Sequence, residues 1–67
     1  MSERQYEFRV RGRLSTHTLH AFSGMDVTEV PAQTIICAIM ADDGEVRTTL
    51  ALIESLGLRL LSIERVM

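Results

Sequence analysis

The sequence predicts an α+β domain whose elements follow the order strand, helix, strand, strand, helix, strand. Three observations give this order: strict alternation of apolar and polar residues near the N-terminus, a long β-branched run in the middle, and helical periodicity followed by a glycine in the second half. The chain has 67 residues, which suffices for one domain. We therefore expect a single domain over residues 1–67.

The first strand is expected over residues 6–14, where apolar and charged side chains alternate. The apolar side carries Tyr6, Phe8, Val10, Gly12 and Leu14, and the charged side carries Glu7, Arg9, Arg11 and Arg13. Ser15 then suits an N-cap, and Ser23-Gly24 suits a helix end. The segment between them predicts a short helix of barely two turns.

A hairpin is expected next, with strands over residues 25–30 and 33–41 and a turn at Pro31-Ala32. The second of these strands is apolar on both sides from Thr34 to Ala41. Such a pattern is typical of a central strand that is covered on both faces, or nearly so.

The second helix begins in an acidic segment, because Asp42 or Asp43 can cap it and Glu45 favours the positive end of the helix dipole. Gly57 ends this helix, and residues 58–66 predict the last strand. We expect a core on the helix side of the sheet made by Leu61, Ile63, Val46, Leu50, Ile53, Phe8 and Val10.

Right-handed crossovers turn this order into a ferredoxin-like split βαβ sandwich (βαββαβ). In this fold a four-stranded antiparallel sheet has its first and third strands in the centre and two helices on one face. The other face then carries either Ile36, Ala38 and Met40 or the alternate set Ile35, Cys37 and Ile39. A 67-residue chain gains little net free energy from its own core, so a second copy is the economical cover for that face.

The segment "GEVRTTLALIESLGLRLLSIERV" resembles the second half of small ferredoxin-like regulatory domains of the ACT type, and "RGRLSTHTLHAFSGMDVTEVPAQTIICAIM" corresponds to the first half. The resemblance spans about residues 6–66. ACT domains typically have an Asp-x-Pro-Gly-like turn after the first strand, where an amino acid binds at the subunit interface. Here Arg13-Leu14-Ser15-Thr16 occupies that place. The resemblance therefore implies the fold and dimerisation, without a particular ligand.

Arg9, Arg11 and Arg13 form the candidate anion-binding or interface site. Residues two apart on a strand lie on one face about 6 to 7 Å apart, so three guanidinium groups can contact a carboxylate, a phosphate or a nucleic-acid backbone. The alternative is a solvated or dimer-facing surface whose arginines pair with Glu7, Glu64 or acids of a partner. The net charge of −2 and the scarcity of exposed aromatics disfavour nucleic acid.

His17 and His20 are weak candidates for metal ligands, since they are three residues apart on the short helix. No third ligand lies in that segment, and capping explains Asp42, Asp43 and Glu45, so we expect no metal site and no cofactor. Cys37 lies mid-strand, where a free thiol usually acts as a small hydrophobe. The sequence identifies no catalytic residue.

The composition predicts a cytoplasmic protein without a membrane segment, because no apolar run is long enough to span a bilayer and the single cysteine excludes a disulfide scaffold. The leading hypothesis is a non-catalytic homodimeric module for small-ligand binding, regulation or assembly, with a small anionic ligand as a further partner. Two alternatives remain: a small dimeric α/β enzyme with a pocket between sheet and helices, and a weak nucleic-acid binder that uses Arg9, Arg11 and Arg13.

Overall fold

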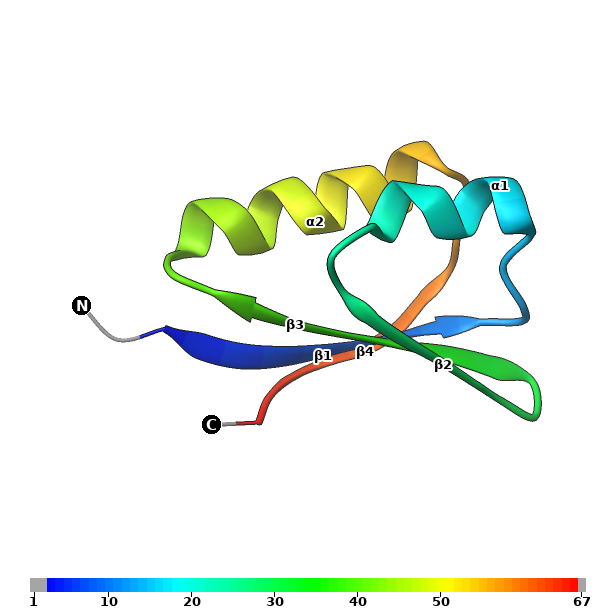
Figure 1. The fold of residues 1–67 in the computed structure, drawn as a ribbon, viewed down its shortest axis with the longest axis horizontal. Helices are drawn as coiled ribbons and strands as arrows, with labels where there is room; N and C mark the ends of the chain where they lie inside the picture. The colour runs from blue at the N-terminus through cyan, green and yellow to red at the C-terminus, as the bar shows by residue number, and fades with distance from the viewer. Residues whose placement is uncertain (1–2, 67) are drawn as a thin grey trace.

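The fold is known from a computed structural model that describes residues 3–66, so Met1, Ser2 and Met67 of the expected domain lie outside the described residues. The elements are β1 (Arg4–Arg11), α1 (Thr16–Leu19), η1 (His20–Phe22), β2 (Asp26–Val30), β3 (Gln33–Met40), α2 (Asp43–Ser55) and β4 (Leu60–Arg65). The strands form one antiparallel sheet in the order β2-β3-β1-β4, with the helices on one side of it (Figure 1). The predicted α+β fold with central first and third strands is confirmed.

Strand β1 ends earlier than its sequence pattern indicates. The prediction that the strand continues to Leu14 is wrong, because the backbone turns at Gly12, whose φ of +80° lies in the left-handed region that favours glycine. The Gly12 N–H donates to the Ala32 carbonyl at 2.9 Å, and its carbonyl accepts from Thr34 Oγ1 at 2.7 Å. Arg13 and Leu14 therefore belong to the connection that leads to α1.

The short helical segment begins where the sequence predicts. Ser15 is the N-cap, and its Oγ accepts a hydrogen bond from the Thr18 N–H at 3.1 Å. After Leu19 the α-helix tightens into the 3₁₀ turn η1, and the Met25 N–H then donates to the Phe22 carbonyl. This bond, together with a φ of +86° at Gly24, directs the chain into β2.

The hairpin forms as predicted, with Val30 opposite Gln33 across the Pro31-Ala32 turn. Its two strands differ in length, because β2 pairs with β3 only as far as Asp26 opposite Cys37. Strand β3 continues to Met40, which lies opposite Arg4 of β1. The last three residues of β3 therefore have a strand neighbour on one side only.

Helix α2 has the cap and the end that the sequence predicts. The Asp42 side chain accepts from the Glu45 N–H at 2.9 Å, and Glu45 Oε2 accepts from the Ala41 N–H at 3.0 Å. At the other end the Gly57 N–H donates to the Glu54 carbonyl, with Gly57 at φ +74°. These bonds satisfy backbone groups that lack partners within the helix.

The core lies between the sheet and the helices. Its fully or nearly fully buried apolar residues are Phe8, Val10, Leu14, Phe22, Ile36, Met40 and Ile53. Alternation along β3 therefore places Ile36 and Met40 on the covered face and leaves Ile35, Cys37 and Ile39 on the open face. The expectation that β3 is covered on both faces is not met within one chain, since Ile39 is 67% exposed.

The expected contribution of β4 to the core is wrong for two residues. Leu61 and Ile63 are 44% and 38% exposed, whereas Val46 and Leu50 of α2 are partly buried against the core. Strand β4 lies at the sheet edge, and its register with β1 shifts between Arg9 and Val10. Helix α2 packs chiefly against β3, so this edge strand receives less cover.

Candidate functional site

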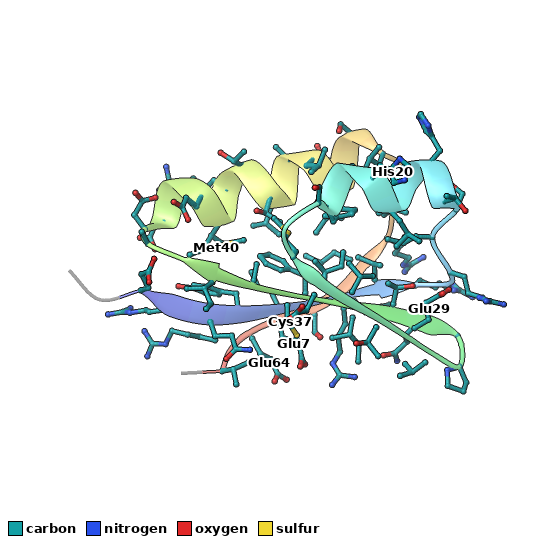
Figure 2. All side chains as sticks on the ribbon, in the orientation of Figure 1. Glu7, His20, Glu29, Cys37, Met40 and Glu64 are labelled. Atoms are coloured by element: carbon teal, nitrogen blue, oxygen red, sulfur yellow. The ribbon has the colours of Figure 1, made fainter. Side chains whose placement is uncertain are left out.

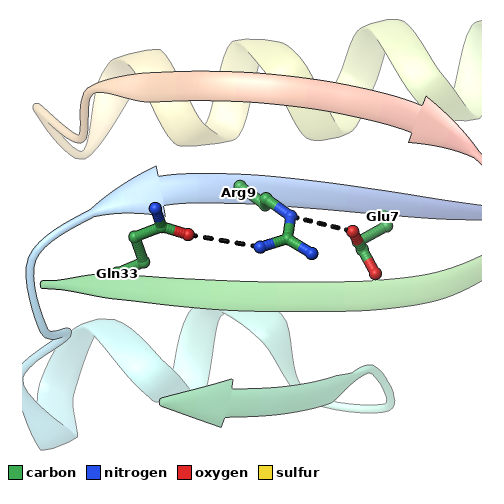
Figure 3. Close-up of polar contacts among 3 residues, drawn as sticks. All are labelled: Glu7, Arg9 and Gln33. Atoms are coloured by element: carbon green, nitrogen blue, oxygen red, sulfur yellow. Dashed lines mark hydrogen bonds and ion pairs between the residues drawn. The ribbon is translucent and has the colours of Figure 1, made fainter. Parts of the chain in front are cut away.

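The open face of the sheet carries one of the three candidate arginines in an ordered polar contact. Arg9 Nε donates to Glu7 Oε2 at 2.9 Å, and Arg9 Nη1 donates to Gln33 Oε1 at 3.3 Å (Figure 3). The Glu7 side chain is only 19% exposed, so this ion pair is partly shielded from water. Arg9 therefore already has a carboxylate partner within the chain.

Arg11 and Arg13 take no part in this contact. Arg13 lies beyond Gly12, and its Nε donates to Glu29 Oε2 at 2.9 Å, an exposed ion pair that raises the pKa of Arg13. Arg11 is exposed at the end of β1 and makes no ion pair within residues 3–66. Of the three predicted residues, Arg11 alone keeps a guanidinium that no carboxylate of the described chain contacts.

The middle of the open face is apolar. Ile35 and Cys37 are half-buried, and Ile39 is exposed beside them. Charges of both signs surround these residues. Figure 2 shows Glu7, Cys37 and Glu64 on the side of the sheet away from the helices, and Glu7 lies directly opposite Glu64 in the β1–β4 register.

The Cys37 thiol is held in its protonated form. Burial raises its pKa most, the nearby carboxylates of Glu7 and Asp26 raise it further, and Arg9 lowers it to a smaller extent. A raised pKa reduces the thiolate fraction, and the thiolate is the nucleophilic form. The predicted behaviour of Cys37 as a small hydrophobe fits this environment.

The weak metal candidates lie away from the open face. His17 and His20 are exposed on α1 and η1, on the helix side of the sheet. In the part of the chain that the structure describes, no group of three or more His, Cys, Asp and Glu side chains is arranged to hold a metal ion. Asp42 and Glu45 instead make the two capping contacts at the start of α2.

A cavity of about 760 Å³ lies at the end of the sheet where β3 extends beyond its pairing with β2. Its wall comes from four places: β1 at Gln5, the segment from Ser23 to Asp26, the C-terminal end of β3, and the segment from Asp42 through the first half of α2. The lining residues are Gln5, Ser23, Gly24, Met25, Asp26, Cys37, Ala38, Ile39, Met40, Asp42, Gly44, Glu45, Thr48 and Thr49. A volume of this size is in the range of ligand-binding sites.

The sequence pattern did not reveal this cavity. It arises because α1 and η1 together span seven residues, from Thr16 to Phe22, whereas α2 spans 13, so the two helices cover unequal lengths of the sheet. In the sequence, the short length of the first predicted helix was the feature that could have indicated this cavity. Its consequence depends on where β2 begins, which only the chain path fixes.

Comparison with known proteins gives one match. A family model described as a domain of unknown function (DUF8691) matches residues 5–64, from β1 into β4. The search of curated proteins and the search of solved structures each find no match. Within residues 3–66, no helix has the length and apolar character needed to cross a membrane.

Proposed function

This chain belongs to the DUF8691 family, and we propose that it is a non-catalytic homodimeric module for small-ligand binding, regulation or assembly in the cytoplasm. One observation carries the proposal: Ile39, on a central strand of the sheet, is 67% exposed. An exposed apolar side chain that continues the half-buried Ile35 and Cys37 on one face suits a protein interface. The partner we propose is a second copy of the same chain.

We assign the domain to the ferredoxin-like, ACT-like class within this proposal. The strand order β2-β3-β1-β4, with both helices on one face, supports the assignment. So does the position of Gly57 between α2 and β4, which follows the resemblance of the C-terminal half to ACT-type domains. A regulatory role follows from the same resemblance.

The charges of the open face also favour association between identical copies. A two-fold interface brings the same patch of each copy together, so it needs acidic and basic groups within one patch. Arg11 and Glu64 supply both signs, since neither makes an ion pair within residues 3–66. In a homodimer, Arg11 of one copy and Glu64 of the other can neutralise each other around the apolar centre.

Arg11 is also the residue we propose for a small anionic ligand. Arg9 and Arg13 each contact a carboxylate of the same chain, so a ligand would have to displace that carboxylate before binding them. The guanidinium of Arg11 has no such competitor within residues 3–66, so in the proposed homodimer an anionic ligand would replace only the Glu64 carboxylate of the other copy. A carboxylate or phosphate group is the chemical class that a free guanidinium binds best.

Light scattering coupled to size-exclusion chromatography tests the homodimer. We expect a dimer for the wild type and a monomer for Ile39→Asp, because a buried unpaired carboxylate is costly at an interface. Ile63→Asp is the matched control: it makes the same change on β4, opposite Phe8 and therefore on the covered side of the sheet. Circular dichroism verifies that both variants fold, and a monomeric wild type at micromolar concentration rejects the proposal.

A further inference from the structure

The C-terminal end of β3 has an unpaired backbone edge. On the β4 side of β1, the Arg11 N–H donates to the Arg59 carbonyl and the Gln5 carbonyl accepts from the Val66 N–H. Because backbone groups alternate between neighbours in an antiparallel sheet, odd-numbered residues of β1 bond β4 and even-numbered ones bond β3. Even-numbered residues of β3 therefore bond β1, and its odd-numbered residues point their N–H and C=O groups toward β2.

Ile39 is the odd-numbered residue that β2 does not reach. The pairing of β2 with β3 ends at Asp26 opposite Cys37, since Gly24 and the Met25-to-Phe22 hydrogen bond turn the chain away. The next backbone donor along the same edge, the N–H of Ala41, is already bonded to Glu45 Oε2. Within residues 3–66, the Ile39 N–H and C=O that point away from β1 therefore have no hydrogen-bond partner.

The cavity of about 760 Å³ lies along this free edge. Side chains from both faces of the sheet line it: Ala38 and Met40 from the covered face, and Cys37 and Ile39 from the open face. Its two ends are the Ser23–Asp26 connection and the first turns of α2. The cavity therefore lies beside residues 38–40 of β3, which would pair with β2 if β2 began three residues earlier.

The charged residues that line the cavity are all acidic. Its charged lining residues are Asp26, Asp42 and Glu45, and no Arg or His from the described chain lines it. Asp26 has no ion pair or side-chain hydrogen bond within residues 3–66, whereas Asp42 and Glu45 each accept one backbone N–H and keep further lone pairs.

From these observations we propose that the cavity binds an extended basic peptide segment of another protein as an additional strand beside β3. The peptide backbone pairs with the N–H and C=O of Ile39. Its apolar side chains contact Met25, Ala38 and Met40 on the covered face, and its lysine or arginine side chains, which alternate to the open face, lie near Asp26. Strand addition of this kind takes its affinity from main-chain hydrogen bonds and its selectivity from the side-chain pockets.

This inference stands apart from the proposed homodimer. The peptide site uses the edge of β3 beyond β2, whereas the dimer uses the centre of the open face. Ile39 contributes its backbone to the first and its side chain to the second, so the Ile39→Asp variant is not used to test peptide binding. Peptide binding and oligomeric state are measured in the same samples, so either proposal can fail while the other holds.

The test uses three probe peptides with the full chain. The first is a blocked pentapeptide of alternating lysine and valine. In the second, glutamate replaces each lysine. In the third, the backbone nitrogens of the lysine residues are methylated, because the residue opposite Ile39 shares the open face and is therefore a lysine. Isothermal titration calorimetry gives the affinities, and ¹⁵N NMR locates the site through the amide signals of Ile39 and Thr48.

We expect the lysine peptide to bind and to shift both amide signals. Methylation is expected to weaken binding about tenfold, because it removes backbone donors while keeping charge and side chains. The glutamate peptide is expected to bind at least about tenfold more weakly, because its carboxylates meet only acidic groups. Raising the salt concentration should weaken the binding of the lysine peptide and leave the fold of the protein unchanged.

Two pairs of variants test whether the peptide binds in the cavity. Thr48→Arg puts a cation and a long side chain in the cavity wall and is expected to abolish binding. Ala51→Arg makes a comparable change at an exposed position of α2 outside the lining and should leave binding intact. Asp26→Asn removes one charge without changing size and should weaken binding about threefold, whereas Glu54→Gln, the matched loss of an acid outside the cavity, should not.

Three results would overturn the proposal. The first is the absence of binding by the lysine peptide. The second is equal binding by the methylated peptide, which would show that the edge of β3 is not used. The third is equally tight binding of n-butylamine with the same NMR shifts, which would make the cavity a site for small amines. If Thr48→Arg does not fold, the comparison of Asp26→Asn with Glu54→Gln decides the location.

Discussion

The two faces of β3 are almost equally apolar in sequence but differ sharply in the fold. On the covered face Thr34, Ile36 and Met40 are at most 3% exposed, whereas on the open face Ile39 is 67% exposed. Both sets lie on the same strand and alternate along it. The helices pack on one side of the sheet (Figure 1), and Ile39 also lacks a neighbouring residue of β2.

The comparison shows how one strand can serve two purposes. Its covered face holds the core of the single chain, and its open face keeps apolar surface that a second chain can bury. A short first helix adds a third feature, since it leaves the end of β3 without a strand neighbour beside a cavity. Three experiments probe the contrast between the two faces.

The largest effect is expected from Ile36→Ala, compared with Ile39→Ala on the same strand. Ile36 is fully buried, so its truncation should lower the free energy of unfolding by about 2 to 5 kcal/mol. Ile39→Ala should cost less than about 0.5 kcal/mol in dilute solution, because water already contacts its side chain. Urea denaturation measures both values.

Repeating this measurement at increasing protein concentration sharpens the comparison. Dimerisation through the open face should make the cost of Ile39→Ala grow with concentration and leave the cost of Ile36→Ala unchanged. Equal costs for the two variants at every concentration would show that the faces do not differ in the way the fold indicates.

A smaller effect is expected from Thr34→Val, compared with Thr28→Val. Thr34 is fully buried and donates from Oγ1 to the Gly12 carbonyl at 2.7 Å, so valine leaves that carbonyl without this donor. The loss should be about 1 to 3 kcal/mol. Thr28 lies opposite Ile35 and is exposed on the open face, so its replacement should change stability by less than about 0.5 kcal/mol. Thermal unfolding followed by circular dichroism measures both, and a larger loss for Thr28→Val would contradict the assignment of faces.

The smallest effect concerns Cys37 and alkaline pH. Its pKa is raised in the folded chain, so the folded state holds the thiol proton more tightly than the unfolded state does. This stabilisation is complete below the pKa of the unfolded thiol and is lost as pH rises through the folded pKa. Between about pH 8 and pH 10, the unfolding free energy of the wild type should therefore fall more steeply than that of Cys37→Ser. Urea denaturation across this range is the measurement, and parallel slopes would contradict it.

Much of the fold could be predicted because it depends on local patterns. Ser15 and Asp42 cap their helices, Pro31-Ala32 makes the hairpin turn, and Gly57 follows the last turn of α2. Each feature involves residues close in sequence, so propensity and spacing contain the needed information. The order of elements and the central positions of β1 and β3 then follow from the connection rules.

The candidate site was less predictable because its contacts join distant segments. Alternation placed Arg9, Arg11 and Arg13 together, but the left-handed backbone at Gly12 separates Arg13 from the strand and Glu29 binds it. The expected burial of Leu61 and Ile63 was wrong for a related reason. A pattern of apolar residues does not show that β4 is an edge strand with a shifted register.

The sequence by itself determined the elements, their caps and the apolar character of both faces of β3, because these depend on the identity and spacing of neighbouring residues. Only the tertiary structure decided that Ile35, Cys37 and Ile39 form the uncovered set and that β2 stops short of Ile39. Burial depends on which element packs against a side chain. In this chain the two helices pack on one face and β2 extends along part of one edge, and no local pattern encodes either fact.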